Sequence, residues 1–352
     1  MKCLAYTRKG TSIYFERQRL CLPDGDSIRM PVASRIKSWL GRWRCFERLF
    51  RLEPRCAAFL SPDKLLVAYQ RKLWIVDIDN AEIVKTISVR QGFSDILSFC
   101  QMAHGEVYYG DYGMNPGEEP IHIYKIGVDL VPTIVYTFPA HQIRHIHSLI
   151  YDKWRNLFFI FTGDMGEHVG IYVANRDFSN VKPFLVGSQQ FRAVVGHVTE
   201  RYLYYATDAV MEDNYLYRVV LDGNPLEKED NSNVECLEGL NGSVIYGCQL
   251  SDGFLMSTTV EPYPSKKSRV MSLLDNRKGL GIKSADVLVY KVSDEGKLHL
   301  LERYKKDGWP MRLLQYGCVQ FPALEDESVK EVPVNPVAVK ECDGKPQTLI
   351  WQ

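Results

Sequence analysis

The sequence lacks the short motifs that identify the common nucleotide-binding, hydrolytic and metal-binding folds. No GxGxxG turn in a strand–helix context, Walker loop or GxSxG elbow occurs, so nucleotide-binding and serine-hydrolase interpretations have no support. The nine cysteines are scattered and odd in number, and none forms a CxxC pair. Neither a zinc site nor a disulfide framework is therefore indicated, and the sequence identifies no cofactor with certainty.

Excess charge and long apolar runs are also lacking. The 43 basic and 43 acidic residues give a formal net charge of +0, which supplies no overall attraction to phosphate and argues against a nucleic-acid partner. No segment reaches the roughly 18 apolar residues of a membrane span, and the first residues do not resemble a secretory signal. Hydrophobic residues make up 45% of the 352 and charged residues 24%, values of a globular chain. We expect a cytoplasmic protein.

A repeated unit of strand, polar turn and second strand runs along most of the chain. The second strand is rich in Tyr, Phe or Leu and ends in small residues and an acid. The units open at Arg55, Ser94, His145, Arg192, Gly242 and Arg312. A repeat of about 40–50 residues is typical of propeller blades. The pattern predicts an all-β protein in which residues 1–352 form a single β-propeller domain. We expect about six four-stranded blades, with five or seven as alternatives, and a last blade completed by strands from Lys2–Tyr6 and Ser12–Arg17.

Two segments interrupt the repeat. In residues 32–51, apolar residues recur at steps of three and four among basic residues, with Glu47 as the one acid. This pattern predicts a basic amphipathic helix, which either lies at a membrane interface or packs across the propeller as a plug with solvated arginines. Residues 264–285 are expected to form a surface loop that carries Lys266, Lys267, Arg269, Arg277 and Lys278.

Propeller topology predicts where chemistry would take place. The acid that ends each second strand returns to the end of the channel where the innermost strand begins, although such acids also cap turns. His145 and His147 are two apart in a strand and should project together; a histidine beside a carboxylate suits a general base. The candidate catalytic residues are His145, His147, Asp164, Asp208 and Glu261. A divalent metal held by His145, His147, Glu167 and His168 is the alternative.

Other residues at the same end of the channel are expected to bind the substrate. Arg192 could hold a carboxylate or phosphate, or it could pair with Asp208 as a structural contact. Aromatic side chains beside carboxylates and amides suit a sugar. The expected substrate-binding residues are Asp111, Tyr112, Asn115, Arg144, Gln189, Arg192 and Lys306.

Several motifs resemble those of sialidase-like β-propellers of the BNR or Asp-box type, which often accompany bacterial surface-polysaccharide genes. They are Tyr108–Asn115, Arg144–His147, Tyr151–Asp152, Thr162–Asp164, Gly187–Arg192, Ala206–Asp208 and Thr259–Glu261. The resemblance covers roughly residues 94–322 and implies a carbohydrate setting.

Two functions remain open. The first is a glycan-directed hydrolase, lyase or transferase that acts on an acidic or phosphorylated sugar, or on a lipid-linked glycan reached through contact of residues 32–51 with the inner face of the membrane. The second is a non-catalytic module for glycan binding or protein assembly, because fold alone does not decide function.

Overall fold

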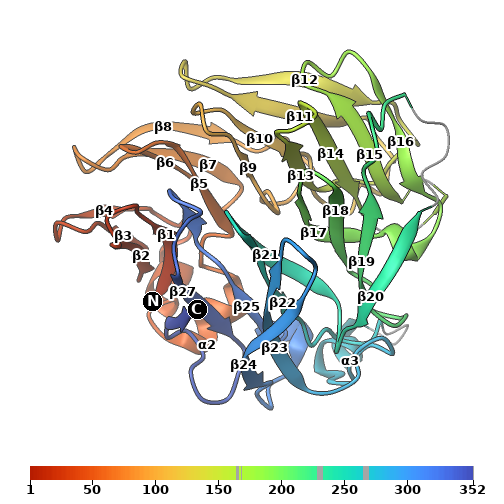
Figure 1. Ribbon diagram of the computed structural model, residues 1–352. Helices are drawn as coiled ribbons and strands as arrows, with labels where there is room; N and C mark the ends of the chain where they lie inside the picture. The colour runs from red at the N-terminus through yellow and green to blue at the C-terminus, as the bar shows by residue number, and fades with distance from the viewer. Residues whose placement is uncertain (164–165, 168, 228–232, 265–268, 352) are drawn as a thin grey trace.

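The computed structural model describes residues 1–163, 166–167, 169–227, 233–264 and 269–351. In these residues the strands form seven sheets arranged around a central axis (Figure 1). The fold is therefore an all-β propeller, and the number of blades is seven, one of the alternatives that the repeat left open.

Five of the blades are regular four-stranded sheets. They consist of β5 (Cys56–Ser61), β6 (Lys64–Tyr69), β7 (Lys72–Asp77) and β8 (Glu82–Ser88); β9 (Cys100–Gln101), β10 (Val107–Gly110), β11 (Ile121–Ile126) and β12 (Pro132–Phe138); β13 (Ile146–Asp152), β14 (Leu157–Thr162), β15 (Gly170–Asn175) and β16 (Val181–Val186); β17 (Ala193–Val198), β18 (Tyr202–Thr207), β19 (Tyr215–Val220) and β20 (Val234–Gly239); β21 (Val244–Leu250), β22 (Gly253–Thr258), β23 (Asp286–Ser293) and β24 (Leu298–Lys305). Within each blade, successive strands pair antiparallel.

The hydrophobic core lies between neighbouring blades. Inner strands are buried on both faces, as in β14, where every residue is buried, whereas the outer strand β8 alternates between exposed and half-buried residues. Close approach of one blade to the next requires a small residue at Gly196, where a Cβ atom would lie 2.7 Å from the Phe161 ring. The two-residue alternation read from the sequence follows from this arrangement.

The ring closes differently from the sequence prediction. The strands β1 (Lys2–Tyr6) and β2 (Ser12–Glu16) do not complete the last blade, because β3 (Arg19–Cys21) and β4 (Ser27–Arg29) extend them into a blade of their own. The last blade contains β25 (Cys318–Gln320), β27 (Glu331–Val337) and β28 (Gln347–Ile350). From it, β26 (Ala323–Leu324) crosses to pair with β1 in parallel. The strand β26 therefore belongs to the sheet of the first blade, although it comes from the C-terminal part of the chain.

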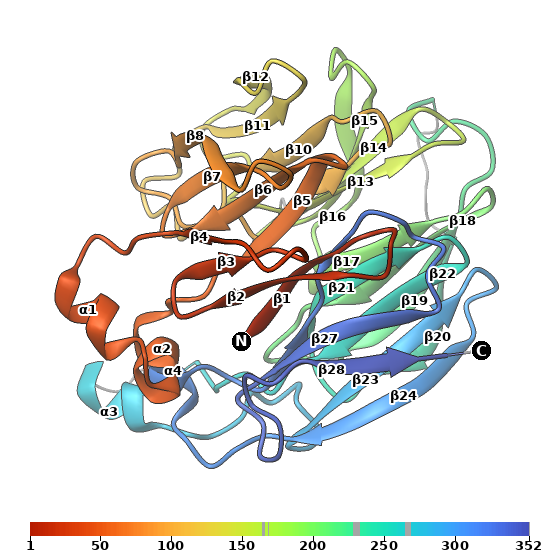
Figure 2. The ribbon, with the colours of Figure 1, turned by 90° about the vertical axis from the view of Figure 1, so that its left-hand side faces the viewer.

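The segment 32–51 is not one helix. It forms α1 (Arg35–Leu40) and α2 (Arg44–Phe50), and Gly41 ends the first helix where a Cβ atom would lie 2.4 Å from Leu52 Cδ1. A second helical pair is formed by α3 (Arg269–Leu274), inside the expected surface loop 264–285, and α4 (Met311–Leu314). All four helices lie on one side of the ring (Figure 2). Among the described residues, no helix is long and apolar enough to cross a membrane.

Candidate functional site

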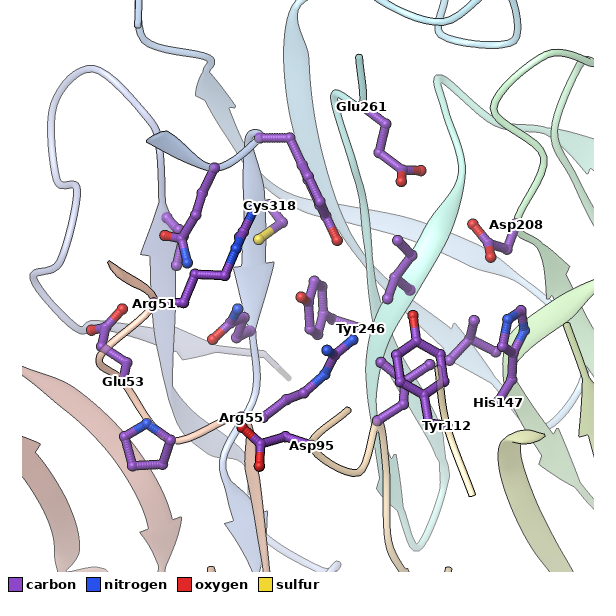
Figure 3. Close-up of a pocket in the computed structure, with 18 of the residues that line it drawn as sticks. Arg51, Glu53, Arg55, Asp95, Tyr112, His147, Asp208, Tyr246, Glu261 and Cys318 are labelled. Carbon is purple, nitrogen blue, oxygen red and sulfur yellow. The ribbon is translucent and has the colours of Figure 1, made fainter. Parts of the chain in front are cut away.

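A cavity of about 380 Å³ opens at one end of the central channel, and we call it the mouth cavity (Figure 3). Every blade, or the segment leading into it, contributes to its lining. The polar and aromatic lining residues are Lys2, Arg51, Glu53, Arg55, Asp95, Tyr112, His147, Arg192, Asp208, Tyr246, Glu261, Gln315, Tyr316, Cys318 and Gln320. Its volume falls in the range of about 300–1,000 Å³ typical of small-molecule sites.

Five of the residues expected at the channel end line this cavity: Tyr112, His147, Arg192, Asp208 and Glu261. The propeller topology explains why. His147 is the second residue of β13, Arg192 precedes β17, and Asp208 directly follows β18. The starts of inner strands and the ends of second strands meet at the same end of the channel, as the repeat predicted.

The two histidines have defined tautomers. Nδ1 of His145 lies 2.7 Å from the carbonyl oxygen of Gly113, and Nδ1 of His147 lies 2.8 Å from that of Ala193. Because a carbonyl oxygen can only accept, each Nδ1 carries a proton and donates it, which leaves Nε2 as an acceptor in the neutral ring. Burial, assisted by the positive charges of His145 and Arg192, holds the pKa of His147 well below its usual range. His147 is therefore a neutral proton acceptor near pH 7.

Arg192 makes the structural contact that the sequence left open as an alternative. Its guanidinium lies 3.2 Å from the carboxylate of Asp208, and the Asp208 amide donates to the Arg192 carbonyl oxygen at 2.9 Å. The two residues flank the inner hairpin of a single blade. The pair fixes both side chains at the wall of the mouth cavity.

The pKa of Glu261 is shifted in the opposite direction from that of His147. It is surrounded by the hydroxyls of Ser243 and Thr259, which donate to its Oε2, the latter at 3.2 Å. Burial raises the pKa of Glu261, and these hydrogen bonds and the charge of Arg192 offset the increase only in part. The carboxyl group therefore keeps its proton to a higher pH than an ordinary glutamate.

Arg55 is the main residue that the sequence argument missed. Its guanidinium lies over the Tyr112 ring, 4.7 Å from the centroid. Across the described parts of the chain, its side chain makes no hydrogen bond or ion pair, and its Nε is buried without a partner. Figure 3 shows the side chain directed between Tyr112 and Tyr246. Arg55 is the first residue of its repeat unit, as Arg192 is of another. This equivalent position in the sequence could have identified Arg55 as a residue of the channel end.

Gln315 is a second polar side chain in the wall without a full set of partners. Its Oε1 is buried and accepts no hydrogen bond within the described residues. Gln315 ends α4 with a φ of 66°, a left-handed backbone conformation that turns the chain into the start of the last blade. The mouth cavity thus contains a buried donor group and a buried acceptor group that the protein itself does not satisfy.

Three expected substrate-binding residues hold local structure away from the lining. Asp111 accepts from Arg90 at 2.9 Å and from the His122 amide at 3.0 Å. Asn115 caps its turn by accepting from the Glu119 amide. Lys306 donates to the Asp307 carboxylate and to the Trp309 carbonyl oxygen.

The remaining expected residues also lie outside the mouth cavity lining. Arg144 pairs with Glu118 at 2.9 Å and lines a smaller cavity with Glu167. Gln189 lies in the short 3₁₀ helix η1 (Gln189–Phe191).

The structure describes only part of the alternative metal site, and of the candidate catalytic residues it leaves one undescribed. Asp164 and His168 lie outside the described residues. Among those that the structure does describe, no group of three or more His, Cys, Asp or Glu side chains is arranged to hold a metal ion. The imidazoles of His145 and His147 lie 5.0 Å apart between ring centroids.

No protein-family model and no curated protein matches this sequence. Solved structures match its fold. A chain of the mitotic checkpoint complex has a TM-score of 0.54 at 8% identity, with 100% of this chain and 89% of that chain covered. Kuenenia stuttgartiensis hydrazine synthase has a TM-score of 0.50 at 10% identity, covering 81% of this chain and 74% of that chain. Dihydro-heme d1 dehydrogenase has a TM-score of 0.50 at 10% identity, covering 99% of this chain and 66% of that chain. At such identities, these similarities show the propeller fold alone.

Proposed function

We propose that the mouth cavity binds a small anionic ligand, an acidic or phosphorylated sugar, and that the protein is an enzyme that transforms it by general acid–base chemistry. One observation carries the proposal. The lining of one cavity combines an arginine that forms no ion pair within the described residues, a neutral histidine and a carboxyl group of raised pKa. The resemblance to sialidase-like propellers agrees with a sugar ligand.

Arg55 supplies the anion-binding group. A guanidinium without an anionic partner binds a carboxylate or phosphate more strongly than one already paired, because no existing ion pair must be broken. Tyr112 lies under this guanidinium, and the tyrosines Tyr246 and Tyr316 also line the cavity. The Arg55 guanidinium therefore lies in a cavity lined by three tyrosines.

The rest of the wall suits a sugar. Three tyrosine rings offer faces to the apolar side of a pyranose ring, and the unsatisfied Oε1 of Gln315 can accept from a sugar hydroxyl. A ligand that pairs with both Arg55 and Gln315 would satisfy two buried groups at once. A ligand without polar groups would leave both unsatisfied.

His147 and Glu261 supply the acid–base pair. An unprotonated imidazole nitrogen and a carboxyl group of raised pKa are groups of the kind that abstract a proton from one atom and protonate another. Hydrolysis, elimination and transfer at a glycan all use such a pair. Their opposite pKa shifts have one common cause, burial, acting on groups of opposite charge type.

Thermal unfolding with a panel of uronic acids, sugar phosphates and sugar nucleotides tests binding. We expect at least one of these ligands to raise the unfolding midpoint of the wild type, because only a ligand that favours the native state does so. Arg55→Met should lose the increase. Arg144→Met, an arginine outside the mouth cavity, should keep it. The proposed binding site is refuted if the increase survives in Arg55→Met.

Catalysis is tested separately with the ligand that binds. His147→Gln and Glu261→Gln should keep the increase in midpoint and lose turnover of that ligand. If the wild type binds but gives no product by chromatography, the enzyme proposal fails, and the alternative of a glycan-binding module takes its place.

A further inference from the structure

The helices α1 and α2 and the residues between them carry a row of aromatic side chains, of which two tryptophans are exposed and two phenylalanines are half-buried. Trp39, Trp43, Phe46 and Phe50 form a row in which consecutive ring centroids lie 5.0, 6.3 and 6.1 Å apart, and we call this row the aromatic ridge. Trp39 is 55% exposed and Trp43 48% exposed, and Ile36 beside them is 72% exposed. An isolated exposed apolar residue is ordinary, but a contiguous row of this kind indicates an interaction surface.

The helices are attached to the propeller by their charged side chains instead. Arg44 makes two hydrogen bonds of 3.1 Å to the carboxylate of Asp343. Arg48, which is only 4% exposed, lies 2.6 Å from Asp307. A plug would bury its apolar stripe and leave its arginines solvated. In α2 the fully buried residues are Glu47 and Arg48, whereas its apolar residues are only half-buried, so this helix packs on the propeller largely through charged side chains.

A second exposed apolar group lies on the neighbouring helices. Met271 and Leu274 on α3 are 59% and 63% exposed, and Trp309 just before α4 is 60% exposed. The helix α4 contacts both α2 and α3. Figure 2 shows all four helices projecting from the same side of the ring. The aromatic ridge is therefore one part of a broader apolar face.

The exposed charges of the segment that carries the aromatic ridge are of one sign. Between residues 27 and 52, the exposed ionic side chains are all cationic: Arg29, Arg35, Lys37, Arg42 and Arg51. The only acid in this stretch, Glu47, is buried and pairs with Arg44 at 2.9 Å. The chain as a whole is neutral, so this concentration of positive charge is local.

We propose that the aromatic ridge and the surrounding cations dock the protein on an anionic membrane surface. Exposed tryptophans insert at the boundary between headgroups and acyl chains, while arginine and lysine contact anionic headgroups. The occupant is a lipid surface because one face offers both groups and no exposed acid opposes them in this segment. This docking does not depend on what the mouth cavity binds. Since Arg51 follows α2 and lines that cavity, docking would turn the mouth toward the bilayer.

Co-sedimentation with vesicles tests the proposal. The full chain is mixed with phosphatidylcholine vesicles with or without about 30% phosphatidylserine, at low and at physiological salt. We expect binding to the anionic vesicles that weakens as salt increases. Trp39→Ser/Trp43→Ser should bind at least tenfold more weakly. Arg35→Gln/Arg42→Gln should lose about fivefold for each removed cation.

The matched control is Trp154→Ser. Trp154 is 44% exposed and lies beyond the end of β13, whereas His147 at the start of that strand lines the mouth cavity. It thus lies at the opposite end of the channel. This variant should bind vesicles as the wild type does. All variants should keep the unfolding midpoint of the wild type, because the substituted side chains are exposed.

Three results would overturn the proposal. The first is no binding to anionic vesicles at low salt. The second is equal loss of binding in Trp39→Ser/Trp43→Ser and Trp154→Ser. The third is a dimer, seen by analytical ultracentrifugation of the wild type without lipid, that the double tryptophan variant abolishes; the aromatic ridge would then bind a second copy of the chain.

Discussion

Gly163→Ala should be strongly destabilising, because a methyl group at this position would collide with His147, which lines the mouth cavity, and with His145, which does not. A Cβ atom there would lie 2.1 Å from Nε2 of His145 and 2.1 Å from Nε2 of His147. Both imidazoles are buried, at 4% and 3% exposure, and each is held by a hydrogen bond, so displacing either ring is costly. To make room, each ring must give up or distort its hydrogen bond to a carbonyl oxygen.

The magnitude follows from these contacts. Overpacking a buried site costs about 1–3 kcal/mol, and each weakened hydrogen bond adds about 1 kcal/mol. Gly163→Ala should therefore lower the free energy of unfolding by about 3–5 kcal/mol. Gly308→Ala is the matched control, because a Cβ atom at Gly308 would have no neighbour within 4 Å, and we expect a change within about 0.5 kcal/mol.

Urea unfolding, followed by tryptophan fluorescence, measures both changes. In the His147→Ala background, one of the two collisions is gone, so the effect of Gly163→Ala should fall by at least about 1 kcal/mol. The reasoning is refuted if Gly163→Ala is as stable as Gly308→Ala. Equal effects in the wild-type and His147→Ala backgrounds would likewise show that the imidazoles are not held as described.

Three further predictions concern charge and thiols. Arg44→Met removes the cation that three carboxylates share and should lower the free energy of unfolding by about 3–5 kcal/mol, whereas the exposed Arg42→Met should change it by less than about 0.5 kcal/mol; urea unfolding compares the two. Because the pKa of His147 is lowered in the folded protein, the unfolded state takes up a proton first as pH falls below about 6.5. The free energy of unfolding should therefore decrease as pH falls through this range. A pH series of urea unfolding should show a smaller decrease in His147→Gln. Of the nine thiols, those of Cys45 and Cys236 are exposed and should react first with a disulfide reagent at pH 8, as mass spectrometry of labelled peptides would show; initial labelling of buried thiols would contradict the structure.

The repeat was sufficient to predict the propeller and to name five of the residues that line the mouth cavity. The position of an acid at the end of a second strand depends only on chain direction, so Asp208 and Glu261 could be placed beside His147 without coordinates. The first blade was not recognised because β3 and β4 have three residues each, with a single buried residue in each strand. Such short strands give too few alternations to stand out from a loop.

The segment 32–51 shows what periodicity cannot determine. Apolar spacing at three and four residues continues across Gly41, which caps α1 through its backbone amide, so the spacing alone does not reveal the break between α1 and α2. Periodicity also identifies two faces without saying which one the protein buries. Here Arg44 pairs with Asp343 and Arg48 pairs with Asp307, and both acids are distant from the helix in the sequence.

Closure of the ring has a consequence for the order of folding. The parallel pairing joins Ala5 to Ala323, and the Asn335 side chain bonds both backbone groups of Cys3. Contacts between residues so far apart in sequence carry the largest loop-closure entropy and form slowly. Lys2, on one side of this junction, and Cys318, on the other, both line the mouth cavity. A complete cavity therefore exists only after the two ends of the chain have met, and the ability to bind ligand should appear in the last phase of refolding.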